Sequence, residues 1–213
     1  MPSTATKTTI DARMKNILAS AAPATNWADA NLEEGVRLAI EEYSRHRPLT
    51  AVGVLTPANL ARELDVSSLT GLQSVTRVWF PYTAAAPEWP PNYIEFDFWM
   101  NAGVPWIRLG EGQACTGAAV ARIFYTKVHT LNGLDAAAAT TWPLLDDGLM
   151  VQGAAGYACL QRSVDLNETS GNMFVSTPNY GALAEIYLTE FRQALYGGED
   201  WHQARMTSRG LII

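Results

Sequence analysis

The chain has 213 residues, of which 48% are hydrophobic and 17% are charged. This length and composition exclude a disordered chain and fit one domain, or one domain that carries an inserted subdomain. The formal net charge is -6 and the basic residues are scattered, which disfavours tight binding to nucleic acid or to an acidic membrane.

The N-terminal segment and the cysteines indicate where the chain folds. The first twenty residues contain charged side chains and no continuous apolar stretch, so we expect no secretory signal peptide. No segment approaches the roughly 20 apolar residues of a membrane span, so we expect no membrane partner. Cys115 and Cys159 lack metal-like spacing and are predicted to be reduced, buried side chains. These features predict folding in a reducing cytoplasm.

Two amphipathic helices are predicted before residue 48. Thr9 is expected to cap the first helix, which ends before Pro23. Asn31 and Glu34 have the spacing of a capping box for the second helix, which stops before Pro48. The apolar positions of the second helix recur at helical spacing: Leu32, Val36, Ala39, Ile40 and Tyr43.

From Leu49 the helical period is lost and short β-rich segments follow. Apolar and polar residues alternate from Ile94 to Asn101, which is the pattern of a half-buried antiparallel strand. Asn101-Ala102-Gly103 predicts a tight turn after it. The predicted strands are Thr50 to Leu55, Ser74 to Tyr82, Asn92 to Asn101, Val104 to Leu109 and Ala118 to Lys127. We expect them to form a small sandwich or barrel.

Two further helices are predicted near the C-terminus. Thr141 is expected to cap a helix that runs to Arg162, and its centre, from Gly153 to Cys159, is rich in small residues that favour close helix packing. Thr177-Pro178 is expected to start a final helix that ends at Gly197-Gly198. Residues 199–213 show no period and end in apolar residues, so we predict an arm that docks on a partner.

The predicted fold class is α+β. Helices from both ends of the chain form a helical bundle, an antiparallel β-sandwich or barrel is inserted between them, and an extended C-terminal arm follows. The predicted division is 1–48 and 131–198 for the helical core, 49–130 for the inserted β subdomain, and 199–213 for the docking arm.

No residue pattern predicts catalysis. His46, His129 and His202 each lack a nucleophile at suggestive spacing, and a structural or solvent-facing role is expected for them. Metal-ligand spacings are absent, and Gly110-Glu111-Gly112 lacks the remaining residues of a phosphate loop. We therefore predict no enzyme activity, no catalytic residue, no cofactor and no metal.

Aromatic residues crowd the β region and leave two interpretations open. If exposed together, they could stack on sugars or on a protein partner, whereas alternation along a strand favours a core plus an interface between subunits. The second interpretation is preferred because Phe96 and Phe98 share one face and Trp99 lies on the other. The set comprises Trp79, Phe80, Tyr82, Trp89, Tyr93, Phe96, Phe98, Trp99 and Trp106.

Four short segments, in order, resemble the head-tail adaptor (connector) proteins of tailed bacteriophages. The helix end from Ala39 to Pro48 contains Tyr-Ser-Arg-His-Arg-Pro, and a strand with an aromatic-proline step follows at 78–82. A strand that leads to a histidine follows at 123–129, and an alanine-rich helix that a proline starts follows at Pro143. The resemblance covers residues 32–196 and rests on the order of these segments.

The resemblance implies a structural virion protein of the neck, made in the bacterial cytoplasm. It implies a homo-oligomeric ring, a dodecamer, that contacts the portal protein on one side and the tail, a stopper or a tail terminator on the other. Double-stranded DNA would pass through without specific binding. The expected portal-docking residues are Trp201, Arg205, Arg209, Leu211, Ile212 and Ile213. The expected subunit-packing residues are Tyr43, Arg45, Arg47, Gly153, Gly156 and Tyr157.

Three alternatives remain. Another neck component, such as a stopper or tail terminator, should be mostly β with fewer flanking helices. A carbohydrate-binding or receptor-binding module would use the aromatic strands. A small hydrolase of unrecognised type is the third.

Overall fold

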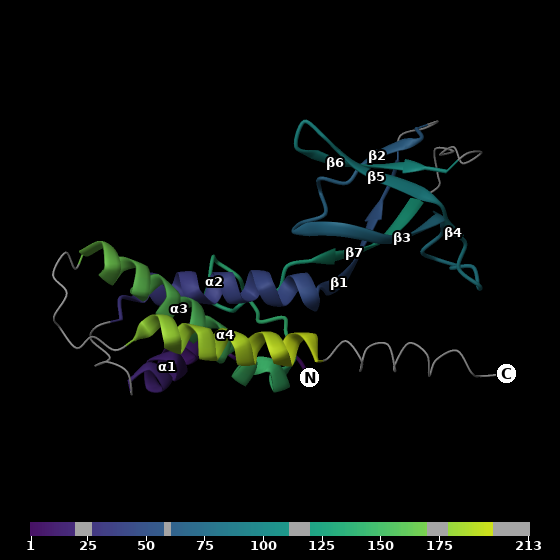
Figure 1. Cartoon of the computed structure of the whole chain (residues 1–213). Helices are drawn as coiled ribbons and strands as arrows, with labels where there is room; N and C mark the ends of the chain where they lie inside the picture. The colour runs from purple at the N-terminus through teal and green to yellow at the C-terminus, as the bar shows by residue number, and fades with distance from the viewer. Residues whose placement is uncertain (20–26, 58–60, 111–119, 170–178, 198–213) are drawn as a thin grey trace. The chain divides into compact units, whose positions relative to one another are not determined.

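The computed structural model of the chain describes residues 1–19, 27–57, 61–110, 120–169 and 179–197. The chain divides into two compact units. Unit 1 comprises Met1–Arg47 and His129–Ile213, and unit 2 comprises Pro48–Val128. Helices make up the regular structure of unit 1 and strands that of unit 2 (Figure 1). The predicted α+β class is confirmed, whereas the predicted C-terminal arm lies outside the described residues.

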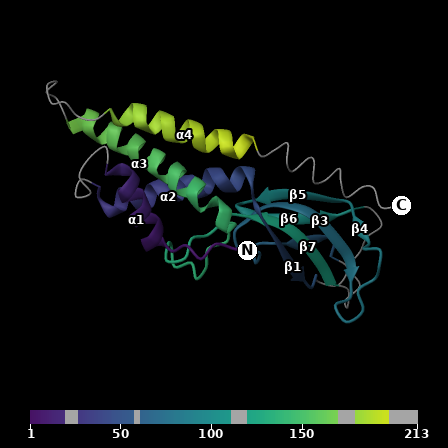
Figure 2. The ribbon, with the colours of Figure 1, turned by 90° about the horizontal axis from the view of Figure 1, so that it is seen from below.

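Unit 1 is built around one long helix. The third helix, α3, packs against the other three, and it lies between α2 and α4 (Figure 2). A short 3-10 helix, η2, leads into α3. The elements are α1 (Lys7–Leu18), α2 (Asp29–His46), η2 (Leu144–Asp146), α3 (Asp147–Thr169) and α4 (Tyr180–Tyr196).

The first two helix starts differ from the predictions. Thr6, not Thr9, is the N-cap of α1; its hydroxyl accepts from the Thr9 backbone, and the Thr9 hydroxyl accepts from the Thr6 backbone. The expected capping box at Asn31 is wrong, because α2 begins two residues earlier and Ala28 provides no side-chain cap. The Asn31 amide instead donates to Asp165 of α3 at 3.3 Å. The Asn31 side chain, which the local pattern predicted as a helix cap, therefore binds a residue distant in sequence.

The predicted start of the third helix is also wrong. Thr141 lies in the loop before η2, where its hydroxyl accepts from the Thr130 backbone at 2.8 Å. Trp142 is fully buried, and its indole N–H donates to Asp147 at 2.8 Å, at the first residue of α3. The helix then continues past Arg162 to Thr169. Asn179 caps α4, and the predicted cap at 177–178 lies outside the described residues.

Three glycines allow the helices of unit 1 to approach closely. A Cβ on Gly35 of α2 would lie 2.7 Å from the Ala154 carbonyl oxygen of α3. A Cβ on Gly153 or Gly156 would lie 2.7 Å and 2.9 Å from the side chains of Phe191 and Leu188 of α4. Since Cβ contacts below 3.0 Å essentially do not occur, the predicted close packing of the small-residue segment is confirmed.

Unit 2 contains two antiparallel sheets. The four-stranded sheet has the order β1-β7-β3-β4, and the three-stranded sheet has the order β2-β6-β5. The short strand β2 was not predicted, and the expected strand from Asn92 to Asn101 is divided into β4 and β5. The strands are β1 (Leu49–Leu55), β2 (Glu63–Asp65), β3 (Leu72–Tyr82), β4 (Tyr93–Ile94), β5 (Phe96–Asn101), β6 (Val104–Leu109) and β7 (Val120–Lys127).

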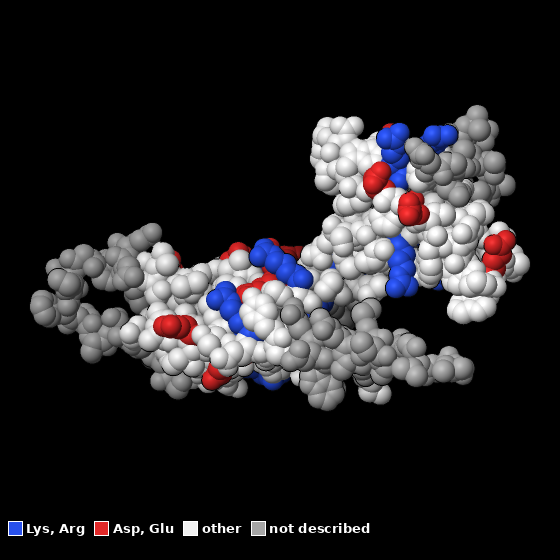
Figure 3. Space-filling model, turned by 45° about the vertical axis from the view of Figure 1, so that its right-hand side comes forward, with Lys and Arg blue, Asp and Glu red and all other residues white. Residues whose placement is uncertain are grey.

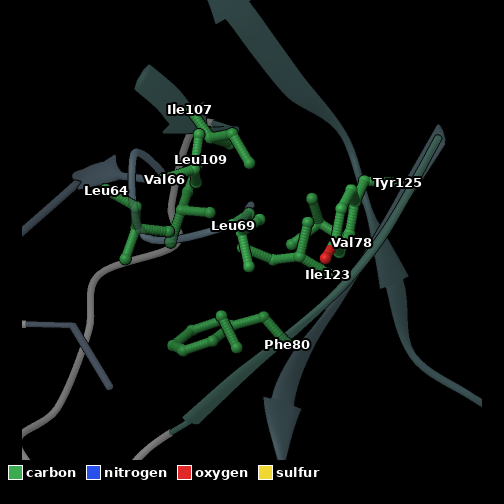
Figure 4. Close-up of a cluster of buried hydrophobic side chains, with 10 residues drawn as sticks. Leu64, Val66, Leu69, Val78, Phe80, Ile107, Leu109, Ile123 and Tyr125 are labelled. Carbon is green, nitrogen blue, oxygen red and sulfur yellow. The ribbon is translucent and has the colours of Figure 1, made fainter. Parts of the chain in front are cut away.

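The core of unit 2 lies between these sheets, as in a sandwich. Ile107 and Leu109 of the smaller sheet and Val78 and Ile123 of the larger sheet belong to one buried cluster, with Leu69 among them (Figure 4). The predicted turn after β5 is confirmed: Ala102 and Gly103 have positive φ, and Asn101 pairs with Val104. This geometry is typical of a two-residue hairpin.

Candidate functional site: a clamp where the chain leaves unit 1

The chain leaves unit 1 after Arg47 and re-enters it at His129, and these two points are bound to each other. The Arg47 carbonyl oxygen lies 2.8 Å from Nε2 of His129. The His129 backbone N–H donates to Oγ of Ser44 at 3.0 Å, and the Ser44 hydroxyl donates to the Ile40 carbonyl at 2.6 Å. The last turn of α2 therefore binds His129, the residue at which the chain re-enters unit 1.

The contacts of the His129 ring define its protonation. A carbonyl oxygen can only accept, so Nε2 carries the proton and donates to Arg47. Nδ1 lies 3.0 Å from the Thr141 hydroxyl and accepts from it. Burial lowers the pKa of His129, and its two backbone hydrogen bonds and Asp146 only partly oppose this effect. A neutral imidazole is thus the form that this site holds.

A second part of the clamp joins α2 to η2. The Tyr43 hydroxyl donates to Asp146 at 2.5 Å, and Arg47 lies 3.4 Å from the same carboxylate. Arg47 also donates to the Ala194 carbonyl of α4 at 2.9 Å. Burial and the Asp146 carboxylate raise the pKa of Tyr43. We call Tyr43, Ser44, Arg47, His129, Thr141 and Asp146 the clamp.

Glu42, the residue before Tyr43 on α2, forms a related cluster with α3 and α4. Its carboxylate accepts from the Tyr157 hydroxyl and from Nε of Arg192, the latter at 2.8 Å. Burial favours the neutral acid, but the hydrogen bonds from Arg192 and Tyr157 outweigh it, so the pKa of Glu42 is lowered. An ionised carboxylate therefore connects three helices.

The clamp has the geometry of a structural site. Ser44 contacts the His129 backbone instead of its ring, and both ring nitrogens are engaged by Arg47 and Thr141. Ser44 thus lacks the hydrogen bond to the imidazole that activates a serine nucleophile. The hydroxyl that does contact the ring belongs to Thr141, and it also accepts from the Thr130 backbone N–H. Within the described residues, no group of three His, Cys, Asp or Glu side chains is placed to hold a metal ion.

The face shown in Figure 3 has no dominant charge. On the face in Figure 3, basic and acidic side chains are interspersed and most of the described surface is uncharged. None of the helices in the described part of the chain is both long and apolar enough to cross a membrane.

All six expected subunit-packing residues make contacts inside unit 1. Tyr43 and Arg47 belong to the clamp, and Tyr157 belongs to the Glu42 cluster. Gly153 and Gly156 face α4. Arg45 is exposed and lies 3.6 Å from Glu41. A contact between subunits through these residues stays a prediction, and the six expected portal-docking residues lie outside the described residues.

Sequence reasoning missed four participants in these clusters. Glu42 and Arg192 are 150 positions apart, and no local pattern links them. Thr141 was predicted only as a helix cap, and Asp146 lies near the start of the helix that was predicted to follow it. Their spacing before α3 gave no sign that their partners were His129 and Tyr43.

Comparisons with known proteins give limited similarity. No protein-family model matches the chain, and no curated protein matches it. A chain from "Neck of native GTA particle computed with C12 symmetry" is 16% identical, with a TM-score of 0.30, covering 79% of this chain and 89% of that one. One from "Neck of empty GTA particle computed with C6 symmetry" is 15% identical, with a TM-score of 0.28 and coverages of 75% and 78%.

A chain from "Virion of native gene transfer agent (GTA) particle" is 15% identical, with a TM-score of 0.29 and coverages of 75% and 77%. TM-scores of this size do not establish a shared fold.

Proposed function

We propose that the chain is a structural subunit of a tailed-bacteriophage neck, namely a head-tail adaptor. The clamp carries this proposal, because it unites three of the four segments on which the resemblance rests. Tyr43, Ser44 and Arg47 come from the first, His129 ends the third, and Asp146 follows Pro143 of the fourth. Segments far apart in sequence thus form one structural site.

The clamp also suggests how such a subunit works. Ring subunits need a rigid frame that presents different surfaces to different neighbours. Arg47, where the chain leaves unit 1, is hydrogen-bonded to His129, where it returns. The helices of unit 1 are therefore joined to each other at the point where unit 2 is inserted. We propose that unit 1 and unit 2 provide the surfaces of a dodecameric ring.

In the proposed neck, the ring contacts the portal through residues 199–213 and a tail, stopper or tail-terminator protein on the other side. Double-stranded DNA passes through its centre. The formal net charge of -6 supports passage without adhesion, because an acidic channel wall repels phosphates. The assembled protein resides in the virion after synthesis in the bacterial cytoplasm.

Mass photometry of the purified full chain, alone and mixed with the portal protein from the same genome, tests this proposal. We expect a ring of twelve copies, or ring formation on the portal. A stopper or tail terminator would fail to bind the bare portal. A stable monomer that does not bind portal rings would therefore overturn the adaptor assignment.

One observation supports the carbohydrate-binding alternative: the Trp89 side chain is 87% exposed. Three other aromatic residues of unit 2 are buried: Trp79, Phe80 and Tyr125 are 5%, 3% and 7% exposed. A glycan array with the wild-type chain and the Trp89→Ala and Trp99→Ala variants separates the two functions. The adaptor proposal predicts no glycan binding in any of the three.

A further inference from the structure

The face of the four-stranded sheet that points away from the core of unit 2 carries an unusual set of side chains. Side chains alternate along a strand, so Arg122 and Phe124 lie opposite the buried Ile123 and Tyr125 of β7. The register places Val54 and Trp79 beside Arg122 on the two neighbouring strands. It places Val52 and Arg77 beside Phe124 in the same way. We call this the outer face.

Arginines cover the aromatic rings of the outer face. The Arg122 guanidinium lies 5.1, 5.4 and 5.8 Å from the ring centroids of Tyr82, Phe124 and Trp79. Arg77 lies 5.4 Å from the centroid of Tyr93. Among the described residues neither arginine has an ion-pair partner. Nη1 of Arg122 donates to the Tyr82 hydroxyl at 3.5 Å, and the other in-plane N–H groups of a guanidinium stacked on a ring stay available for a carboxylate.

These contacts favour a protein partner over a nucleic acid. Bases bind to a sheet by stacking on free aromatic faces, whereas here guanidinium groups already lie over the rings. Val52, Val54 and Tyr93 beside them are 45%, 54% and 44% exposed. The outer face therefore fits a surface that offers carboxylates next to an aliphatic side chain.

Helix α4 of a second copy offers such a surface. Glu185 and Ile186 are adjacent and exposed, Ile186 by 52%, and Thr189 and Glu190 continue the same exposed side of the helix. Among the described residues Glu185 has no ion-pair partner. Acidic residues outnumber basic ones in unit 1, so its charge complements the two unpaired arginines.

We propose that the outer face of one copy binds the Glu185–Glu190 side of α4 in the next copy, with Arg122 and Arg77 paired to its carboxylates. This inference rests on the proposed ring and names the contact that builds it. The two surfaces differ, so the contact is heterologous. Repeated from copy to copy, such a contact generates a ring when the rotation between neighbours closes.

Charge reversal in the full chain tests the contact. Arg122→Glu and Glu185→Arg should each raise the protein concentration needed for assembly by on the order of tenfold or more, because each places like charges across the interface. Arg108→Glu, the same change on the three-stranded sheet, is the matched control and should assemble like the wild type. Mass photometry measures all of them.

An equimolar mixture of the two single variants gives the sharper result. In an alternating ring every contact pairs opposite charges again, so the mixture should assemble where each variant alone does not. Should Arg122→Glu fail to fold, the exposed Arg77→Glu replaces it in the same mixture.

The outcomes separate the inference from the function on which it rests. If the wild-type chain forms a ring and both charge-reversal variants form it equally well, or if their mixture stays unassembled, the contact is overturned and the adaptor function is not. A wild-type chain that never assembles, even on the portal, overturns the function itself. Binding of a single-stranded oligonucleotide that Arg122→Glu abolishes would assign the outer face to nucleic acid and overturn the inference.

Discussion

At the scale of single residues, His129 is the most constrained group of the clamp. Its ring donates to Arg47 and accepts from Thr141, and its backbone donates to Ser44. All three contacts suit a neutral imidazole. A proton on Nδ1 would require the Thr141 hydroxyl to rotate and accept, and burial of the ring opposes the added charge.

The stability of the protein should therefore depend on pH through His129. Its pKa is lowered in the folded chain, so the unfolded chain takes up the proton first as the pH falls. The contribution of His129 to the free energy of unfolding should be constant well above pH 6.5 and should fall as the pH decreases below about 6.5, by about 1.4 kcal/mol per unit of pKa difference. Urea unfolding at pH 8, 6 and 5 measures it.

His129→Gln provides the comparison, because glutamine can still donate to the Arg47 carbonyl but does not titrate. We expect this variant to be less stable at pH 8 and to lose the part of the pH dependence that lies between pH 6.5 and 5. His46→Gln, the same substitution at an exposed position on α2 outside the clamp, is measured beside it. An unchanged slope in His129→Gln would mean that another group titrates.

At the scale of elements, glycines set the distances between the helices of unit 1. The side of α3 that faces α4 carries Gly153 and Gly156, and the side of α2 that faces α3 carries Gly35. Glycine in a helix costs about 1 kcal/mol of helix propensity relative to alanine. Close packing of Phe191 and Leu188 over the bare backbone offsets that cost.

Gly156→Leu should overpack the interface between α3 and α4. The first added carbon already meets the Leu188 side chain at 2.9 Å and its backbone nitrogen at 3.2 Å, so α4 must move. We expect the free energy of unfolding to fall by about 1–3 kcal/mol. Thermal and urea unfolding provide the measurement, and unchanged stability would contradict this packing.

A second glycine of the same helix serves as the matched control. A Cβ on Gly148 would have only the Arg13 guanidinium nearby, at 3.9 Å. Gly148→Ala should therefore leave the protein as stable or raise the free energy of unfolding by about 0.4–1 kcal/mol. If the free energy of unfolding falls in Gly156→Leu and rises in Gly148→Ala, then packing, and not helix propensity alone, determines the effect of a substitution in α3.

At the scale of the whole molecule, the inserted sheet and the helical frame have different charge and chemistry. Acidic residues are in excess in unit 1, while the outer face of unit 2 carries two unpaired arginines over aromatic rings. One chain thus carries two complementary surfaces, as a head-to-tail ring requires.

Removal of residues 199–213 tests the proposed arm at this scale. We expect the truncated chain to keep the wild-type circular dichroism spectrum and melting temperature, because the helices α1 to α4, whose described buried side chains form the core of unit 1, all lie before residue 199. It should still fail to join portal-bearing heads in an assembly assay. Heads that retain DNA and accept tails with the truncated protein would refute this role for the arm.

The sequence by itself determined the class of the fold and most of its elements. Local signals were sufficient there: helical spacing in 32–43, alternation in 94–101, and the Asn-Ala-Gly turn that the structure confirms. Each of these depends on residues within a few positions of one another. The predicted strand Val104 to Leu109 agrees with β6 at both ends for the same reason.

Only the tertiary structure decided how the polar residues are used. Asn31, Thr141 and Asp146 have the local pattern of helix starts, yet each makes a contact with a residue distant in sequence. A hydroxyl or carboxylate can satisfy a nearby backbone group or a distant side chain at similar cost, so sequence spacing does not discriminate between them. The folded core determines which partner each polar group binds, because an unpaired buried polar group costs about 1–3 kcal/mol.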